Sequence, residues 1–449
     1  MRTKFIELWY SITSSYWFVP TLMTVIAIVF SFITIAIDET LIKSGWIESV
    51  NWFYSNKPEG ARSVLSTVAG SMITVAGVVF SITIVVLSLT SSQFGPRLLH
   101  NFMRDTVSQI VLGTFIATFI YCLLILRTIR SGEETEFVPQ ISVIVGVLLS
   151  VASIGVLIYF IHHISQSIQA ANIIAGVGHD LEKGIKELYP EMVGREEPGQ
   201  KPWWRNQGDV PSNFEEEAHP VTAAGSGYVL AIDNEGLMKI AVEEKVILHL
   251  KHNPGDFIVQ GSNLVMVWPS ERADENLAKK VNNTFILGKQ RTHTQDVKFA
   301  IDQLVEIAVR ALSPGINDPF TAMMCIDKLG VALCHLAERA IPSPYRYNDD
   351  GKLCIITKSV KFVDVVDTAF NQIRQYGRTS AAVTIRLLET IAVIAERVHR
   401  YEDRAALLRH AAMIERGSRE GLSEELDRRD VKERYEAVVQ TLVKKKTFN

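Results

Sequence analysis

An uncharged run from Val64 to Thr90 limits most tightly what this sequence can fold into. At about 1.5 Å per residue, its 27 residues would form a helix roughly 40 Å long, enough to cross a bilayer with tilt. Three further uncharged runs, at 19–37, 107–126 and 138–161, have the same character. The sequence therefore predicts a membrane domain of four transmembrane helices over residues 1–161.

The second of these predicted helices carries hydroxyl groups at helical spacing along one face. They are Thr67, Ser71, Thr74, Ser81 and Ser88. Gly70 and Gly77 form a second row of small residues, again seven positions apart. Such a face can line a water-filled pore when several copies surround an axis. Small residues and hydroxyls also allow close helix packing without any pore, so both interpretations stay open.

A conducting pore also needs a gate. Val78, Val85 and Leu89 lie near the hydroxyl face and are the predicted apolar constriction. Gln93 and Arg97 follow directly and would set the charge at the mouth of the pore.

Charge is distributed unevenly along the chain. Residues 1–161 hold nine Lys and Arg and nine Asp and Glu, which leaves 37 basic (46 − 9) and 40 acidic (49 − 9) residues in 162–449. The second part is thus polar and slightly acidic, which does not favour nucleic-acid binding. Four spans place both termini on one side of the membrane. The positive-inside count is nearly balanced, and we expect that side to be cytoplasmic because the large soluble part shows no disulfide pattern.

The remaining chain predicts an α+β region. Residues 162–224 read as a helical extension to Pro190 followed by a linker. Short alternating runs over 225–270, including LMKIAV, predict the strands of a small β-barrel or sandwich. Residues 271–449 predict a helical domain. Its helices are expected at 295–312, 318–339, 358–376, 380–415 and 423–445, with a polar loop at 341–352.

Polar residues gather around one predicted helix of this region. The ligand-binding candidates are Arg291, Asp296, Asp302, Glu306, Arg310, Asn317 and Asp318. Their oxygens and charges are able to hold a ligand or a divalent ion. A ladder of ion pairs four residues apart, followed by a capped turn, explains the same pattern without a ligand. His162 and His163, after the fourth span, read as interface residues or as a metal or pH-sensing pair.

No catalytic motif is visible, and none of the four cysteines has a metal-binding spacing. The sequence therefore predicts neither an enzyme nor a metal site or cofactor.

Three stretches of the sequence resemble those of a known family. They are LSTVAGSMITVAGVVFSITIVVLSLTSSQFGPRLLHNFMRD, VLGTFIATFIYCLLIL and ALSPGINDPFTA. The chain resembles bacterial predicted membrane proteins grouped as domain-of-unknown-function family 2254. The resemblance implies a multi-span bacterial inner-membrane protein with a soluble C-terminal region, and it implies no activity or catalytic residue.

The favoured hypothesis is a homo-oligomeric channel with the second span around the axis and a cytoplasmic vestibule or sensor below it. Its partners would be the lipid bilayer, further copies of the chain, and a small ion or cytoplasmic ligand. The rival hypothesis is a membrane-anchored ligand-binding or signalling protein that does not conduct.

Overall fold

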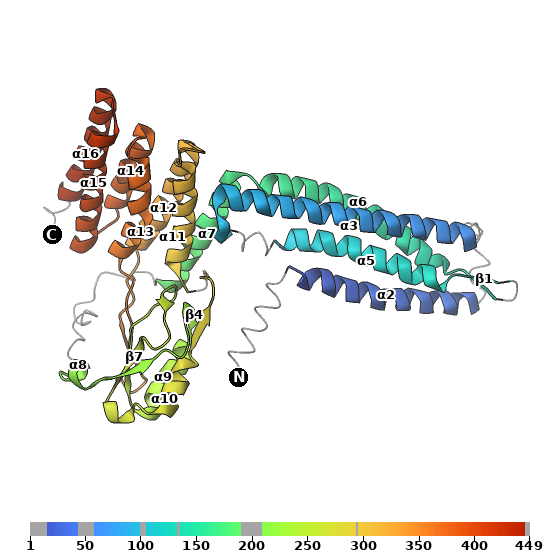
Figure 1. The fold of residues 1–449 in the computed structure, drawn as a ribbon, viewed down its shortest axis with the longest axis horizontal. Coiled ribbons are helices and arrows are strands. Elements are labelled where there is room, and N and C mark those ends of the chain that lie inside the picture. The colour runs from blue at the N-terminus through green and yellow to red at the C-terminus, as the bar shows by residue number, and fades with distance from the viewer. Residues whose placement is uncertain are drawn as a thin grey trace. The chain divides into compact units, whose positions relative to one another are not determined.

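The computed structural model describes residues 16–43, 58–98, 105–132, 135–189, 209–292 and 295–444. The chain divides into two compact units, Met1–Asn172 and Ile173–Asn449 (Figure 1). Each unit has its own buried core and is described by itself.

The first unit is a bundle of four long helices that run side by side (Figure 1). Their bounds are α2 Phe18–Lys43, α3 Pro58–Phe94, α5 Thr106–Thr128 and α6 Gln140–Ser167. Short elements between them are η2 Pro96–Leu98, β1 Arg130–Gly132 and β2 Thr135–Phe137. The four predicted membrane helices are confirmed, and each extends past the predicted span at one end or both.

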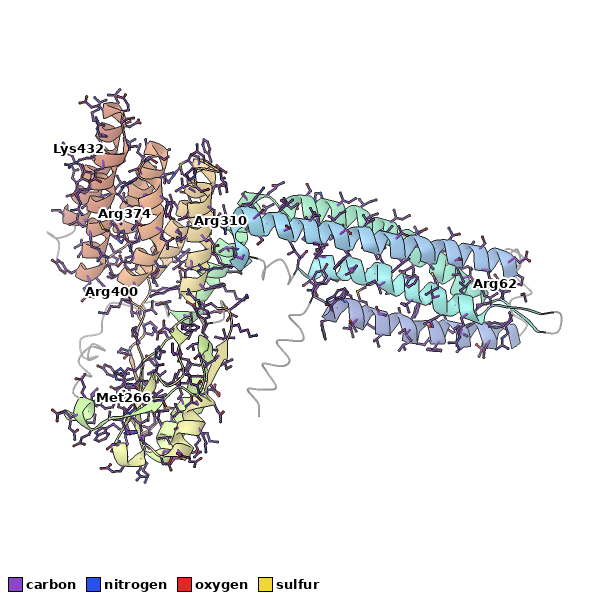
Figure 2. The ribbon with its side chains drawn as sticks, viewed as in Figure 1. Arg62, Met266, Arg310, Arg374, Arg400 and Lys432 are labelled. Carbon is purple, nitrogen blue, oxygen red and sulfur yellow. The ribbon has the colours of Figure 1, made fainter. Side chains whose placement is uncertain are left out.

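Local chemistry explains where these helices start and stop. Gly95 takes a φ of 114°, which lets the backbone leave α3 before Pro96. Asp105 caps α5 by accepting hydrogen bonds from the amides of Val107 (3.3 Å) and Ser108 (3.2 Å). Arg62 on α3 donates to the carbonyl of Ile129 (2.8 Å), just past the end of α5 (Figure 2). Polar groups thus close the helix ends.

The first uncharged run, 19–37, stops just before Asp38, but the helix does not end there. Helix α2 continues to Lys43, and Asp38 is fully buried. Its carboxylate accepts hydrogen bonds from the backbone amides of Ile141 (2.9 Å) and Ser142 (3.0 Å) and from the Ser142 hydroxyl (2.6 Å). One helix therefore supplies the N-terminal cap of another, and this partnership allows a charge inside the bundle.

The outer faces of α2 and α6 carry large apolar side chains that are more than half exposed in the single chain. They include Val25, Ile26, Val29, Phe32, Leu148, Val151, Ile154 and Ile158. A lipid environment explains such surfaces. A fifth helix in the second unit, α12 (Pro319–Ala337), is also long and apolar enough to span a membrane. However, 61% of its apolar window is buried within the protein, against 22–50% for the other four, so we assign α12 to a protein core.

The second unit contains two open sheets with helices packed around them. The five-stranded sheet has the order β3-β7-β5-β10-β9, and the three-stranded sheet has the order β6-β4-β8. The strands are β3 His219–Thr222, β4 Gly227–Ile232, β5 Ile247–Leu250, β6 Phe257–Ile258, β7 Asn263–Trp268, β8 Phe285–Gly288, β9 Tyr345–Tyr347 and β10 Leu353–Ile356. The predicted mixed α and β architecture is confirmed, although the sheets are open and do not close into a barrel.

The run LMKIAV does not form the strand that its alternation predicted. It lies in helix α9 (Asn234–Glu244), which Asp233 caps by accepting from the amide of Gly236 (2.9 Å). Lys245, with a φ of 53°, ends this helix. The Asp-Asn-Glu-Gly sequence from Asp233 to Gly236 is thus a helix start.

The sheet also extends beyond the segment 225–270 that was expected to hold it. Strands β9 and β10 come from the expected polar loop and the residues after it. Strand β10 pairs in parallel with β5, so that Ile355 faces Leu248 in the register. A pairing between such distant segments leaves no local pattern in the sequence.

Helices make up the rest of the second unit. They are α7 Ala170–Leu188 (whose first three residues belong to the first unit), α8 Phe214–Glu217, η4 Ser270–Arg272, α10 Glu275–Asn282, α11 Val297–Ala311, α12 Pro319–Ala337, α13 Phe362–Gly377, α14 Ala381–Ala395, α15 Tyr401–Gly421 and α16 Glu425–Lys444. The extension after the fourth span is broken at 168–169, and the helix expected at 380–415 is two helices. Asp318 caps α12 as predicted, accepting from the amide of Thr321 (3.1 Å), with Pro319 in the first turn.

Candidate functional site

The hydroxyl face of α3 lies on the outside of the bundle. A different row of α3 side chains, including Leu65, Ala69, Met72 and Val79, is buried against the other helices. All five predicted pore-lining residues are exposed in the single chain. None of them is buried against α2, α5 or α6, so this face is available to lipid or to another subunit.

Most of these hydroxyl protons are satisfied within α3 itself. Thr67, Ser71, Thr74 and Ser81 each donate to the backbone carbonyl four residues earlier, at 2.7–2.8 Å. Such bonds leave the oxygen lone pairs free to accept from water or a neighbouring helix. The face is therefore polar but needs no partner for its donors.

The same face has a regular spacing that the hydroxyl groups alone do not reveal. Adding two valines and one more serine gives an alternation of four and three residues, all exposed: Thr67, Ser71, Thr74, Val78, Ser81, Val85, Ser88 and Ser92. This spacing is that of a seam between helices in a left-handed coiled coil. The hydroxyl-only pattern concealed it, because valines occupy two of the positions.

The predicted gate residues share this exposure. Val78, Val85 and Leu89 are 52%, 57% and 45% exposed. Gly70 and Gly77, beside the seam, have no atom within 4 Å of where a Cβ would be, so nothing in the single chain covers them. The whole seam is thus an uncovered surface of small and β-branched residues.

A second candidate site lies in the second unit. It is a cavity of about 530 Å³, a volume suited to a metabolite-sized molecule. Its apolar lining includes Leu188, Ile232, Met238, Leu250, Val297 and Ile355, and its polar lining includes Tyr189, Asn234, Asn253, Gln295, Thr357 and Ser359. Three of the predicted ligand-binding residues, Arg291, Asp296 and Asp302, also line it.

These three residues form one ion-paired cluster. Arg291 donates through Nε (2.9 Å) and through a terminal nitrogen (2.7 Å) to Asp296, and through its other terminal nitrogen to Asp302 (2.6 Å). Asp296 also caps α11 by accepting from the amide of Phe299 (3.2 Å). Gly255, with a φ of 91°, lets a neighbouring turn approach so closely that a side chain there would clash with Asp296.

Burial and charge oppose each other in this cluster. Burial alone would lower the pKa of Arg291, but Asp296 and Asp302 outweigh it and raise that pKa. Burial also raises the pKa of Asp296, and Arg291 reverses only part of the effect. Because every nitrogen of Arg291 is already bonded to a carboxylate, the cluster acts as a fixed wall of the cavity.

The other four predicted residues lie away from the cavity lining. Arg310, which Figure 2 labels, pairs with Glu306 on α11, as the ion-pair interpretation predicted; its Nε lies 3.6 Å from the Glu306 carboxylate. Asn317 has a φ of 51° in the turn before α12, and Asp318 caps that helix. Bonds from Thr321 outweigh the opposing effect of burial and lower the pKa of Asp318.

Three cations of the cavity were missed in the sequence. Lys298 stands at the start of α11, Arg346 lies on β9, and Lys358 follows β10. Arg346 belongs to the expected polar loop and Lys358 to the start of an expected helix, and the pairing of β10 with β5 brings this part of the chain to the cavity. Lys298 lies two residues from Asp296 and could have been included by its spacing, whereas no local signal would have found Arg346 or Lys358.

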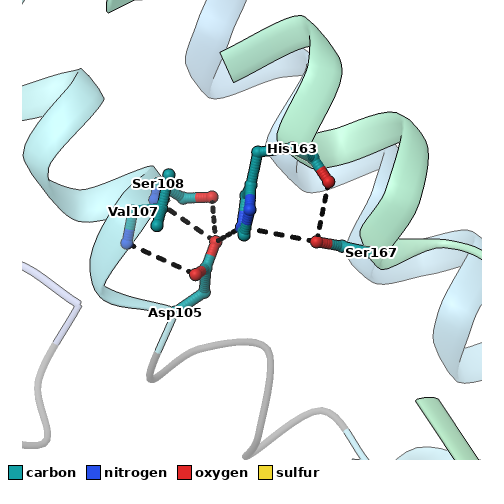
Figure 3. Close-up of polar contacts among 5 residues, drawn as sticks. All are labelled: Asp105, Val107, Ser108, His163 and Ser167. Carbon is teal, nitrogen blue, oxygen red and sulfur yellow. Dashed lines mark hydrogen bonds and ion pairs between the residues drawn. The ribbon is translucent and has the colours of Figure 1, made fainter. Parts of the chain in front are cut away.

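His163 has a structural partner at one end of the bundle (Figure 3). Its Nε2 lies 3.0 Å from the carboxylate of Asp105 and 3.3 Å from the hydroxyl of Ser167. The Ser108 hydroxyl donates to the same carboxylate (2.5 Å). These contacts tie the start of α5 to the end of α6. Among the described residues, no group of three or more potential metal ligands includes His163.

The residues that match known proteins include both the hydroxyl face of α3 and the cavity of the second unit. A model of the family described as predicted membrane protein DUF2254 matches residues 13–393. The uncharacterized proteins Rv1290c of Mycobacterium tuberculosis and Mb1321c of Mycobacterium bovis are each 30% identical over 394 residues, which are 86% of this chain and 73% of the relative. No solved structure matches the chain. With its four long apolar helices, the chain is a multi-pass membrane protein.

Proposed function

The chain belongs to the DUF2254 family of predicted membrane proteins, and from that premise we propose that it assembles into a homo-oligomeric pore lined by α3. The observation that supports this proposal is the uncovered seam from Thr67 to Ser92. A face of small residues with coiled-coil spacing allows identical helices to approach closely.

The hydroxyl groups give such an assembly a polar axis. Oxygens of Thr67, Thr74 and Ser81 would replace part of the hydration shell of a passing ion. Val78 and Val85 interrupt the polar face and would form its apolar constriction. The termini would be cytoplasmic, with the second unit as vestibule or sensor.

Cysteine cross-linking in membranes tests the assembly. Ser81→Cys places a thiol on the seam, whereas Ile84→Cys places one on an exposed apolar position (48% exposed) off the seam, about a sixth of a turn from Ser81. All four native cysteines are buried, so they give little background. We expect a cross-linked dimer with Ser81→Cys and little with Ile84→Cys. Equal cross-linking at both positions would argue against the seam as the interface.

Recording from planar bilayers tests conduction. We expect a conductance from the purified protein, and we expect Ser81→Leu to reduce it because leucine is larger and cannot replace ion hydration. Ile84→Leu is the matched control, since it changes an apolar side chain off the seam. If the wild-type protein never conducts at any voltage, tension or pH, the pore is excluded.

A second candidate function has its own supporting observation. The cavity of about 530 Å³ in the second unit combines apolar and polar lining, as small-molecule sites do. In this alternative the helices anchor the protein, and the second unit binds a ligand without catalysing a reaction. Ligand binding by a protein that never conducts would favour this alternative.

A further inference from the structure

The charges in the cavity do not balance once the fixed cluster is set aside. The remaining charged lining residues are Lys298, Arg346, Lys358 and a single acid, Asp256. Asp256 already accepts from the amide of Asn253 (2.9 Å). Within the described parts of the chain, no carboxylate lies in ion-pair contact with any of the three cations. With the cluster included, the lining holds four basic and three acidic residues, so the cavity keeps an excess of one positive charge.

Arg346 is the most informative of the three cations. One of its terminal nitrogens donates to the backbone carbonyls of Ser343 and Tyr345 (3.4 Å), which hold the guanidinium in place. Its Nε and second terminal nitrogen have no acceptor among the residues that the structure describes. Burial lowers the pKa of Arg346, and no neighbouring acid opposes the effect. A half-buried guanidinium without a counter-ion is an unfavourable arrangement that a bound anion would relieve.

Lys358 lines the same cavity as this arginine. In the register of β9 and β10, Arg346 faces Ile355, and the chain then runs through Thr357, Lys358 and Ser359 along the cavity wall. Lys298 contributes from α11. The Tyr189 phenol also lines the cavity, and burial raises its pKa to about 12, so it remains a hydrogen-bond donor at neutral pH.

We propose that this cavity binds an organic anion, a molecule with a phosphate or carboxylate group on a partly apolar body. Arg346 would hold the anionic group through its two free donor nitrogens, with Lys358 and Lys298 adding charge. The apolar lining, such as Met238 and Leu250, would cover the body of the ligand. The inference rests on the second candidate function and is independent of the pore.

Isothermal titration calorimetry of the full chain in lipid nanodiscs tests the proposal. The probes are adenosine 5′-monophosphate, inorganic phosphate and benzoate, with neutral adenosine as the uncharged counterpart. We expect saturable binding of the monophosphate or of benzoate that weakens as salt is added. Adenosine is expected to bind at least tenfold more weakly than its monophosphate.

Three variants locate the binding site. Arg346→Gln is expected to weaken binding by about tenfold to a hundredfold, as the loss of a charged hydrogen-bond donor does. Lys358→Gln alters an exposed side chain, so it tests the same site should the arginine variant fail to fold. Lys432→Gln, on α16 and 63% exposed, is the matched control for lost positive charge (Figure 2). Binding in the control should equal that of the wild type.

The outcomes separate this inference from the function on which it rests. Weakening in Arg346→Gln or Lys358→Gln, but not in Lys432→Gln, supports the anion site. Adenosine binding as tightly as its monophosphate would overturn the anion site but leave a ligand-binding cavity. If no probe binds at millimolar concentration, the anion site fails for both chemical classes. Anion binding unaffected by all three variants would place it elsewhere and also overturn the proposal.

Discussion

Replacing Asp38 by alanine tests whether one buried carboxylate holds two membrane helices together. The substitution removes the acceptor for the backbone amides of Ile141 and Ser142, at 2.9 and 3.0 Å. A hydrogen bond to a charged group contributes about 1.5–3 kcal/mol, so the two amides together account for about 3–6 kcal/mol. Both donors lie at the start of α6, where the helix itself offers no acceptor.

We expect Asp38→Ala to lower the free energy of unfolding by about 3 kcal/mol or more. Asp38→Asn keeps one carbonyl oxygen and should lose roughly half as much. The free energy is measured by SDS titration of the purified protein in mixed micelles, followed by tryptophan fluorescence. Glu39→Ala is the matched control, because Glu39 is the next residue on α2 and is exposed.

Asp38 does not hold the two helices together if Asp38→Ala and Glu39→Ala differ in stability by less than about 1 kcal/mol, the range of ordinary surface substitutions. Such a result would mean that the amides of Ile141 and Ser142 find equivalent partners without the carboxylate.

Three further substitutions give separate tests. Burial raises the pKa of Asp403 from 3.8 to about 6, so its contribution to stability is present below pH 3.8 and is lost as the pH rises through 6. Asp403→Asn should therefore raise the free energy of unfolding at pH 8 by up to about 3 kcal/mol, which thermal unfolding would show as a higher midpoint temperature than that of the wild type. Near pH 4 the two proteins should unfold at the same temperature. Asp105→Ala removes the cap of α5 and the partner of His163, and should lower the free energy of unfolding by about 1–3 kcal/mol in SDS titration. Gly113→Ala puts a methyl group against α2, 3.1 Å from the Pro20 backbone, and should destabilise by about 1–3 kcal/mol, whereas Gly155→Ala meets nothing within 4 Å and should not.

The membrane helices could be predicted well because their signal is local and strong. Uncharged runs such as Val64–Thr90 admit few other structures. Helix ends were harder to predict, because they depend on partners from elsewhere in the chain. Asp38 would end a helix in water, but here it lies inside the bundle because α6 supplies its hydrogen-bond donors.

Partners from distant parts of the chain also limited how much of the cavity could be predicted. Arg291, Asp296 and Asp302 lie close in sequence, so their clustering was predictable from spacing on and before α11. Arg346 reaches the cavity only through a parallel strand pairing that the sequence does not reveal. The strand predicted at LMKIAV failed for a different reason, because its alternation of apolar residues also fits a short helix and the Asp233 cap decides between them.

The parallel pairing of β5 with β10 also affects how the chain is made. The two strands are separated by roughly 100 residues, so β5 emerges from the ribosome well before its neighbour. At about 5–20 residues per second, one edge of β5 stays open for roughly 5–20 s. That edge carries Ile247, Leu248 and Leu250 and offers unpaired backbone groups to any other strand. A chain that stalls before Leu353 keeps this edge open, so another strand is able to pair with it during this interval.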